Sequence, residues 1–142
     1  MGNNVLALTF PGGNFQQAVT SITLVNNTAK TEDVTVPAGK RWVLQSIKVT
    51  NPDNVTRTIQ GVLYKEAGKT NHIAQILKVT NLAASGRHQA PHDSPAQALD
   101  TFHDVRGRIL AAGNTISIIW ATGGASAGGT DADGLVIEYL EL

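Results

Sequence analysis

The hydrophobic pattern along the chain is that of β-strands. Apolar and polar residues alternate over short runs, and Gly, Pro, Asn and Asp cluster between the runs. A period of two, with β-branched and aromatic residues, is typical of strands, and such frequent turns are typical of sandwiches and barrels. Alternating helical segments are absent, which argues against doubly wound folds. We therefore expect an all-β protein: a single antiparallel β-sandwich domain over residues 1–142, with eight or nine strands.

The expected strands share this alternation, with one ambiguous run. The run 73–82 also fits one or two helical turns, but its Val, Ile and Thr content and its position after a hairpin loop at 66–69 favour a strand. The predicted strands are 4–10, 15–25, 32–36, 42–49, 57–65, 72–82, 99–105, 115–120 and 135–142.

The stretch 34–49 organises the rest of the chain. A short extended run meets Pro37-Ala38-Gly39-Lys40, where proline lacks an N–H and glycine readily takes positive φ, so the chain turns. A long strand follows. Its apolar phase shifts near Gln45, which indicates either a β-bulge or a strand that is partly covered on both faces.

A similar unit lies about half a chain further on. Ala111-Ala112-Gly113-Asn114 has the same turn chemistry and precedes a long strand that ends at Trp120. A fold made of two Greek-key halves would contain such a repeated turn-and-strand unit, although two short turns can also be alike by chance. The sequence therefore predicts a jelly-roll-like arrangement.

Two segments break the strand pattern. Residues 83–98 form a long irregular segment, and residues 123–134 are a tongue rich in Gly, Ala and Ser. Irregular loops of such length in a compact domain are usually functional or disordered. Both are candidates for binding a partner, as is the N-terminal segment 1–4, although a glycine-rich tongue can equally be exposed and idle.

Composition narrows the function classes. The 142 residues carry no net charge and only 15% are charged, so no general attraction to nucleic acid or to an anionic membrane is expected. The absence of cysteine excludes disulfides, thiolate metal sites and cysteine nucleophiles. The first residues lack the basic and long apolar regions of a signal peptide or membrane span.

Three histidines are the candidate metal ligands. His88 and His92 have a His-x3-His spacing and His103 follows, but Pro91 opposes the helix that would place the first two imidazoles on one face. Polar loop residues are the simpler interpretation. We therefore predict no metal, no cofactor and no catalytic residue, and hence no enzyme.

Other candidate residues also have simple structural interpretations. Asp131 and Asp133 resemble the start of a calcium loop but lack its later ligands, so an Asp-Gly turn is favoured. Ser126 lies in the glycine-rich tongue and not at a strand-to-helix elbow. Trp42 and Trp120 are expected in the core or at a subunit contact; exposed together, they would form a sugar-stacking platform.

The stretches 34–49 and 110–120 resemble the small jelly-roll structural proteins of tailed bacteriophages, in which Val-Pro-Ala-Gly turns lead core strands of head-decoration (cement) proteins and of tail or fibre modules. The resemblance extends in style over residues 32–142. It implies a non-enzymatic virion protein made in the host cytoplasm.

The most specific expectation is a capsid decoration protein that stabilises the head by binding the major capsid lattice, as a homotrimer and without nucleic acid or membrane. A tail fibre, baseplate or glycan-binding adhesion module is the alternative. A small metal enzyme related to the cupins would require the three histidines to converge.

Overall fold

All regular structure in the described residues, 14–91 and 102–142 of the computed structural model, is β-strand. The all-β prediction is therefore confirmed, including a strand over the ambiguous run after residue 72. The strands are β1 (Asn14–Leu24), β2 (Lys30–Thr35), β3 (Trp42–Thr50), β4 (Arg57–Tyr64), β5 (His72–Leu82), β6 (Arg87–Ala90), β7 (Phe102–His103), β8 (Ile109–Leu110), β9 (Thr115–Trp120) and β10 (Gly129–Glu141).

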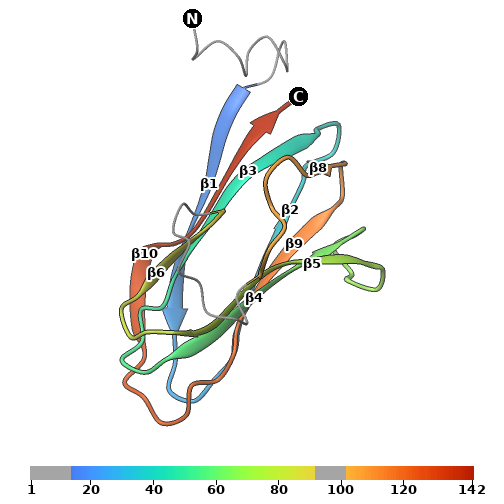
Figure 1. Cartoon of the computed structure of the whole chain (residues 1–142). Helices are drawn as coiled ribbons and strands as arrows, with labels where there is room; N and C mark the ends of the chain where they lie inside the picture. The colour runs from blue at the N-terminus through green and yellow to red at the C-terminus, as the bar shows by residue number, and fades with distance from the viewer. Residues whose placement is uncertain (1–13, 92–101) are drawn as a thin grey trace, which may run out of the picture.

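The strands form two antiparallel sheets that pack face to face (Figure 1). Sheet A has the order β1-β10-β3-β6, with β8 also paired to β3, and sheet B has the order β2-β9-β4-β5-β7. The consecutive pairs β1–β2, β3–β4, β5–β6 and β9–β10 each have one strand in each sheet, so the chain crosses repeatedly between the layers. This is the jelly-roll plan that the sequence predicts. The described residues contain ten strands; β6, with four residues, and β8, with two, have no counterpart among the strands predicted from the sequence.

The core lies between the sheets, where alternate residues of each strand face inward. Removing these apolar side chains from water is the main stabilising contribution to such a fold. The fully buried members include Ile22, Leu44, Ile47, Val49, Ile59, Ile76, Leu77, Leu110, Ile116, Ile118, Leu135 and Ile137.

Both tryptophans belong to this core. The Trp120 side chain is completely buried, and its Nε1 donates a hydrogen bond to the carbonyl of Thr50 at 2.8 Å. Trp42 is 3% exposed and stacks on Tyr139, with ring centroids 3.8 Å apart. The expectation of core residues is confirmed, and the alternative of an exposed sugar-stacking pair is wrong.

The organising stretch folds as its sequence indicates. Gly39 has φ of +75°, and Lys40 N donates to Pro37 O at 3.2 Å, which closes the turn before β3. Within β3 the pairing with β10 skips Gln45, since Ser46 faces Glu138 and Leu44 faces Tyr139. This bulge keeps the apolar side chains on both sides of it directed to the core.

The two similar turns lie side by side. Gly113 has φ of +87° and Asn114 N donates to Ala111 O, so the second turn closes like the first. Val36 N donates to Asn114 O, and Gly113 N donates to Val36 O, both at 2.9 Å. The turns therefore extend the pairing of β2 with β9 past the ends of these strands.

The two predicted loops are shorter than expected. Segment 83–98 contains β6, whose residues Arg87–Ala90 pair with β3, so it is not irregular throughout. The prediction of a loop over 123–134 is wrong from Gly129 onward, because strand β10 begins there. Small residues are required there because a Cβ on Gly129 would lie 2.0 Å from Pro52 O, and one on Gly134 would lie 2.5 Å from Ile22 Cβ. The small residues in this part of β10 are therefore explained by the close approach of neighbouring segments of the backbone, and not by a loop.

The remaining differences concern the ends of segments. The strand expected over 99–105 has only Phe102–His103 as strand in the described residues. The strand expected over 4–10 and the whole interval 92–98 lie outside the residues that the structure describes.

Candidate interaction surface

Two of the three candidate metal-ligand histidines lie in the described residues, and they are on different sheets. His88 lies on β6 of sheet A, whereas the backbone of His103 belongs to β7 of sheet B, and His92 lies outside the described residues. Within residues 14–91 and 102–142, no group of three or more His, Asp or Glu side chains is arranged to hold a metal ion.

Asp131 and Asp133 form a turn-like contact within β10. The amide of Asp133 donates to Asp131 Oδ1 at 2.9 Å. This hydrogen bond is the usual way in which an aspartate stabilises a local bend of its own backbone. The Asp-Gly turn expected from the sequence is therefore wrong, because both aspartates lie within β10, where the pairing with β1 shifts its register between Thr20 and Ile22.

A buried ion pair joins the loops at one end of the sandwich. Asp53 and Arg57 have completely buried side chains, and Arg57 donates to Asp53 Oδ2 from Nε at 3.0 Å and from Nη2 at 2.6 Å. The remaining guanidinium hydrogens reach backbone carbonyls of two other loops. These acceptors are Thr28 O, Val25 O and Ala121 O, at 2.8–3.0 Å. The Arg57 side chain thus holds together three loops, those between β1 and β2, between β3 and β4, and between β9 and β10.

The glycine-rich loop before β10 is fixed by side-chain acceptors. Three successive amides, those of Ser126, Ala127 and Gly128, donate to Asn26 Oδ1, Asn54 Oδ1 and Asp53 Oδ1, at 2.8–3.1 Å. Gly128 has φ of +71°, and a Cβ there would lie 2.4 Å from Leu24 O. A loop held in this way is a fixed structural element, and whether it binds a partner stays a prediction.

Hydrogen bonds in two loops favour the ionised form of the Asp53 and Glu66 carboxyl groups. Burial acts to raise the pKa of Asp53, but hydrogen bonds from Arg57 and from the Asn54 amide outweigh it, so the pKa lies below its ordinary value of 3.8. At the β4–β5 turn, hydrogen bonds from Thr70, and further ones from Asn71, lower the pKa of Glu66 to about 2.

We expect the protein to lose stability in acid because of these groups. A carboxyl whose pKa is lower in the folded state stabilises the fold fully above its unfolded pKa and loses that contribution as the pH falls through the folded pKa. The free energy of unfolding should therefore decrease between pH 4.5 and about 2. Urea denaturation over this range measures it. Glu66→Gln should show a smaller decrease, whereas Glu32→Gln, which loses only a surface pair with Lys30, should match the wild type. An unchanged slope in Glu66→Gln would contradict the assignment.

The outer face of sheet A carries an apolar row across four strands. Phe15 of β1 faces Leu140 of β10, Leu140 faces Val43 of β3, and Val43 faces Ile109 of β8. The alternate residues of these strands point into the core, so this row points away from it. Its two ends are open, with Phe15 55% and Ile109 59% exposed, while Val43 and Leu140 are buried. We call these four residues the outer apolar row.

A polar row lies beside it, two residues along β1 and β10 and, because of the bulge at Gln45, three residues along β3. Glu138 accepts hydrogen bonds from Ser46 Oγ at 2.7 Å and from Gln17 Nε2 at 3.1 Å, and Lys48 Nζ lies 3.1 Å from its Oε1. These partners lower the pKa of Glu138. The carboxylate is fully occupied by neighbouring strands, so it holds the sheet together and is not presented to a ligand.

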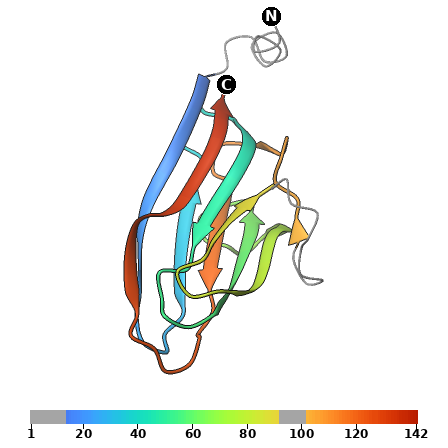
Figure 2. The ribbon, with the colours of Figure 1, turned by 60° about the vertical axis from the view of Figure 1, so that its left-hand side comes forward.

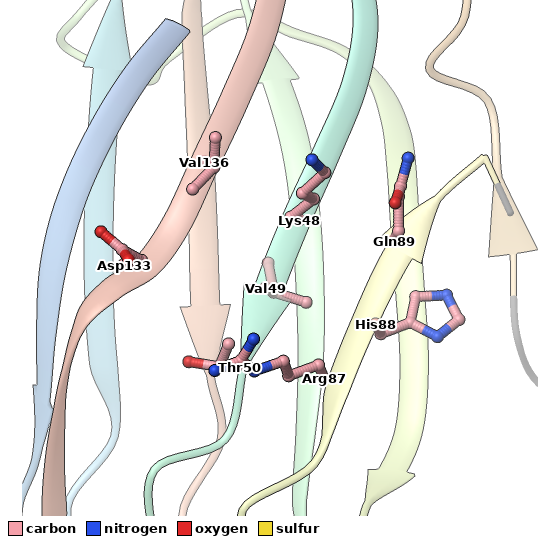
Figure 3. A pocket seen from close by; sticks show the side chains of 8 residues that line it. All are labelled: Lys48, Val49, Thr50, Arg87, His88, Gln89, Asp133 and Val136. Carbon is pink, nitrogen blue, oxygen red and sulfur yellow. The ribbon is translucent and has the colours of Figure 1, made fainter.

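A shallow depression of about 420 Å³ adjoins this polar row (Figure 3). Arg87 extends from β6 toward Thr50 on β3, whose Oγ1 is buried and has no hydrogen-bond partner in the structure. Lys48, also at the rim, is already paired with Glu138. The lining residues are Lys48, Val49, Thr50, Arg87, His88, Gln89, Asp133 and Val136, a mixture of both charges without Phe, Tyr or Trp.

Comparison with known proteins adds no family. No protein-family model matches the chain, and a search of curated proteins finds no match. The described residues contain no helix capable of spanning a bilayer. Among the features described, the outer apolar row is the one that combines large exposed apolar side chains with a rigid sheet, so we take it as the candidate interaction surface.

This surface is not visible in the sequence alone. Phe15 and Ile109 lie far apart in the chain, and they fall into one row only through the register of β1, β10, β3 and β8. The one local signal was Val43, which alternates with core residues in β3 and remains apolar on the opposite phase.

Proposed function

We propose that the protein is a non-enzymatic virion component, a capsid decoration protein that binds the major capsid lattice of a tailed-phage head. The observation that carries the proposal is the outer apolar row, with Phe15 and Ile109 more than half exposed on the face of a rigid sheet. Exposed apolar residues in one row are typical of protein–protein contacts. The jelly-roll topology and the similarity of residues 34–49 and 110–120 to phage structural proteins support the same class.

The polar features support a structural role. The most strongly bonded charged groups, Asp53 with Arg57 and Glu138 with its partners, connect strands and loops of the protein itself. Such groups rigidify a scaffold and leave recognition to the surface between them. The glycan-binding alternative is less favoured because Trp42 and Trp120 are buried.

The location of the protein in purified particles tests this proposal. We expect hundreds of copies on the head, as a lattice-binding protein requires, measured by quantitative mass spectrometry of separated heads and tails. A few copies confined to the tail would contradict the decoration role and favour a fibre or baseplate. The homotrimer expected from the sequence stays a prediction, which the mass of the isolated protein tests.

A matched pair of variants tests the surface itself. Ile109→Lys places a charge at an open end of the outer apolar row and should weaken binding to heads about tenfold or more, since desolvating an unpaired charge in a contact opposes binding. Ile73→Lys alters another exposed apolar residue, on β5 of sheet B, and should bind like the wild type. Equal binding by both variants would exclude this face.

A further inference from the structure

Strand β1 forms an edge of sheet A. Among the described residues its only strand partner is β10, and in Figure 2 it lies at the outside of the sheet. An eleven-residue edge strand presents a row of backbone N–H and C=O groups that can pair with another strand.

The side chains of β1 do not protect this edge. Proteins usually guard an exposed edge with lysine, proline or other charged residues. Between Asn14 and Leu24 there is no charged residue and no proline. The corresponding edge of sheet B is different, since β2 contains Lys30, Glu32 and Asp33. Likewise Arg87 lies on β6, at the far side of sheet A.

Large exposed apolar side chains gather along the same strand. Phe15 is 55% exposed, Val19 is 51% exposed, and Val25, next to the end of β1, is 57% exposed. They are half of the six large apolar side chains that are exposed in the described part of the chain. Between Phe15 and Val25, the outward positions hold Gln17, Val19, Ser21 and Thr23, all uncharged. The strand therefore offers both backbone pairing and apolar contact.

We propose that β1 pairs antiparallel with β1 of a second copy of this chain, so that sheet A continues through both copies. Around a two-fold axis a strand faces itself, and any charge near the axis meets the same charge on the partner. The absence of charge makes β1 suited to this arrangement, and β2 unsuited. The outer apolar rows of the two copies would then lie on one face of a continuous sheet. The contact is two-fold and thus differs from the trimer expected from the sequence.

Measurement of mass against concentration tests the pairing. The full chain should form dimers in sedimentation or light-scattering experiments. Val19→Lys should raise the dimer dissociation constant about tenfold or more because it brings two lysines together at the contact. The control Ile73→Lys adds the same charge on β5 and should dimerise like the wild type. A full chain that stays monomeric at high micromolar concentration overturns the proposal, including the case in which its own residues 4–10 cover β1.

Disulfide cross-linking then tests the register. The chain has no cysteine, so every cross-link comes from the residue introduced. Antiparallel partners lie about 4.5–5.5 Å apart at Cα, within reach of a disulfide only when they are opposite. Across the single variants Phe15→Cys, Gln17→Cys, Val19→Cys, Ser21→Cys and Thr23→Cys, self-cross-linking should peak at one position, the one nearest the two-fold axis.

Mixtures of two such variants should cross-link when their positions are equally far on either side of that peak. Ile73→Cys is the matched control and should not cross-link. A flat profile along β1, or a mass of three chains without a peak, overturns the proposal. None of these readouts involves phage heads, so the dimer and the decoration role can fail separately.

Discussion

Replacement of Arg57 by methionine should lower the free energy of unfolding by about 3–5 kcal/mol, the usual cost of removing one partner of a buried ion pair. Methionine retains much of the apolar bulk of the arginine stem, so the loss is chiefly electrostatic. It leaves the Asp53 carboxylate buried without its cation. It also removes the guanidinium donor from the carbonyls of Thr28 and Ala121, and it leaves Val25 O with only the Thr28 amide, at 3.2 Å. Each unsatisfied buried acceptor adds to the cost.

Asp104 and Arg108 provide a natural control. This pair has the same i, i+4 spacing and a comparable contact between Arg108 Nη2 and Asp104 Oδ2, but its side chains are 27% and 51% exposed. Surface pairs contribute about 0–1 kcal/mol, so Arg108→Met should unfold almost like the wild type. Both variants are compared by urea denaturation at neutral pH. Similar losses in the two would show that burial of Asp53 and Arg57 does not determine the effect.

The second large effect is expected from Gly129→Ala, which should destabilise the protein by about 3 kcal/mol or more. A Cβ at this position would lie 2.0 Å from Pro52 O and 3.0 Å from Pro52 C, so the backbone of β10 or of the β3–β4 connection must move. Insertion of one carbon into a tightly packed site usually costs about 1–3 kcal/mol, and here the neighbour is backbone and not a side chain that can rotate.

Alanine substitutions at two other glycines serve as controls, because they separate the effect of steric crowding from the other effects of replacing glycine by alanine. Gly68→Ala meets only the Glu66 side chain, at 4.0 Å, and should leave stability unchanged within about 1 kcal/mol. Gly124→Ala meets nothing within 4 Å but has φ of +83°, so its loss reports backbone strain alone, about 1–2 kcal/mol. Thermal or urea denaturation ranks the three variants. A loss in Gly129→Ala no greater than in Gly124→Ala would contradict the close approach to Pro52.

The fold could be predicted because local signals agree with its long-range pairing. Pro37 and Gly39 mark a turn, and the phase shift near Gln45 indicates a bulge or a strand covered on both faces, without knowledge of any partner strand. The glycine-rich part of β10 could not be predicted, because Gly129 and Gly134 are required by Pro52 O and Ile22, which are distant in the chain. Read locally, such residues indicate a loop.

The candidate surface could not be predicted for a related reason. Phe15 and Ile109 belong to one row only because β10 and β3 lie between β1 and β8 and pair in the required register. The sequence does show one of the two features on which the proposed pairing of β1 depends, the lack of charged residues from Asn14 to Leu24. What it lacks is the position of that strand at the edge of a sheet, which depends on the order of all the strands.

The position of β10 between β1 and β3 has a consequence for how the protein is made. Sheet A joins the first and the last of the described strands, so its middle stays empty until residues 129–141 have left the ribosome. Folds dominated by such distant pairings assemble in milliseconds to seconds, not microseconds. The apolar sides of β1 and β3 therefore stay without their partner strand until β10 has been synthesised, and the sandwich closes only after that.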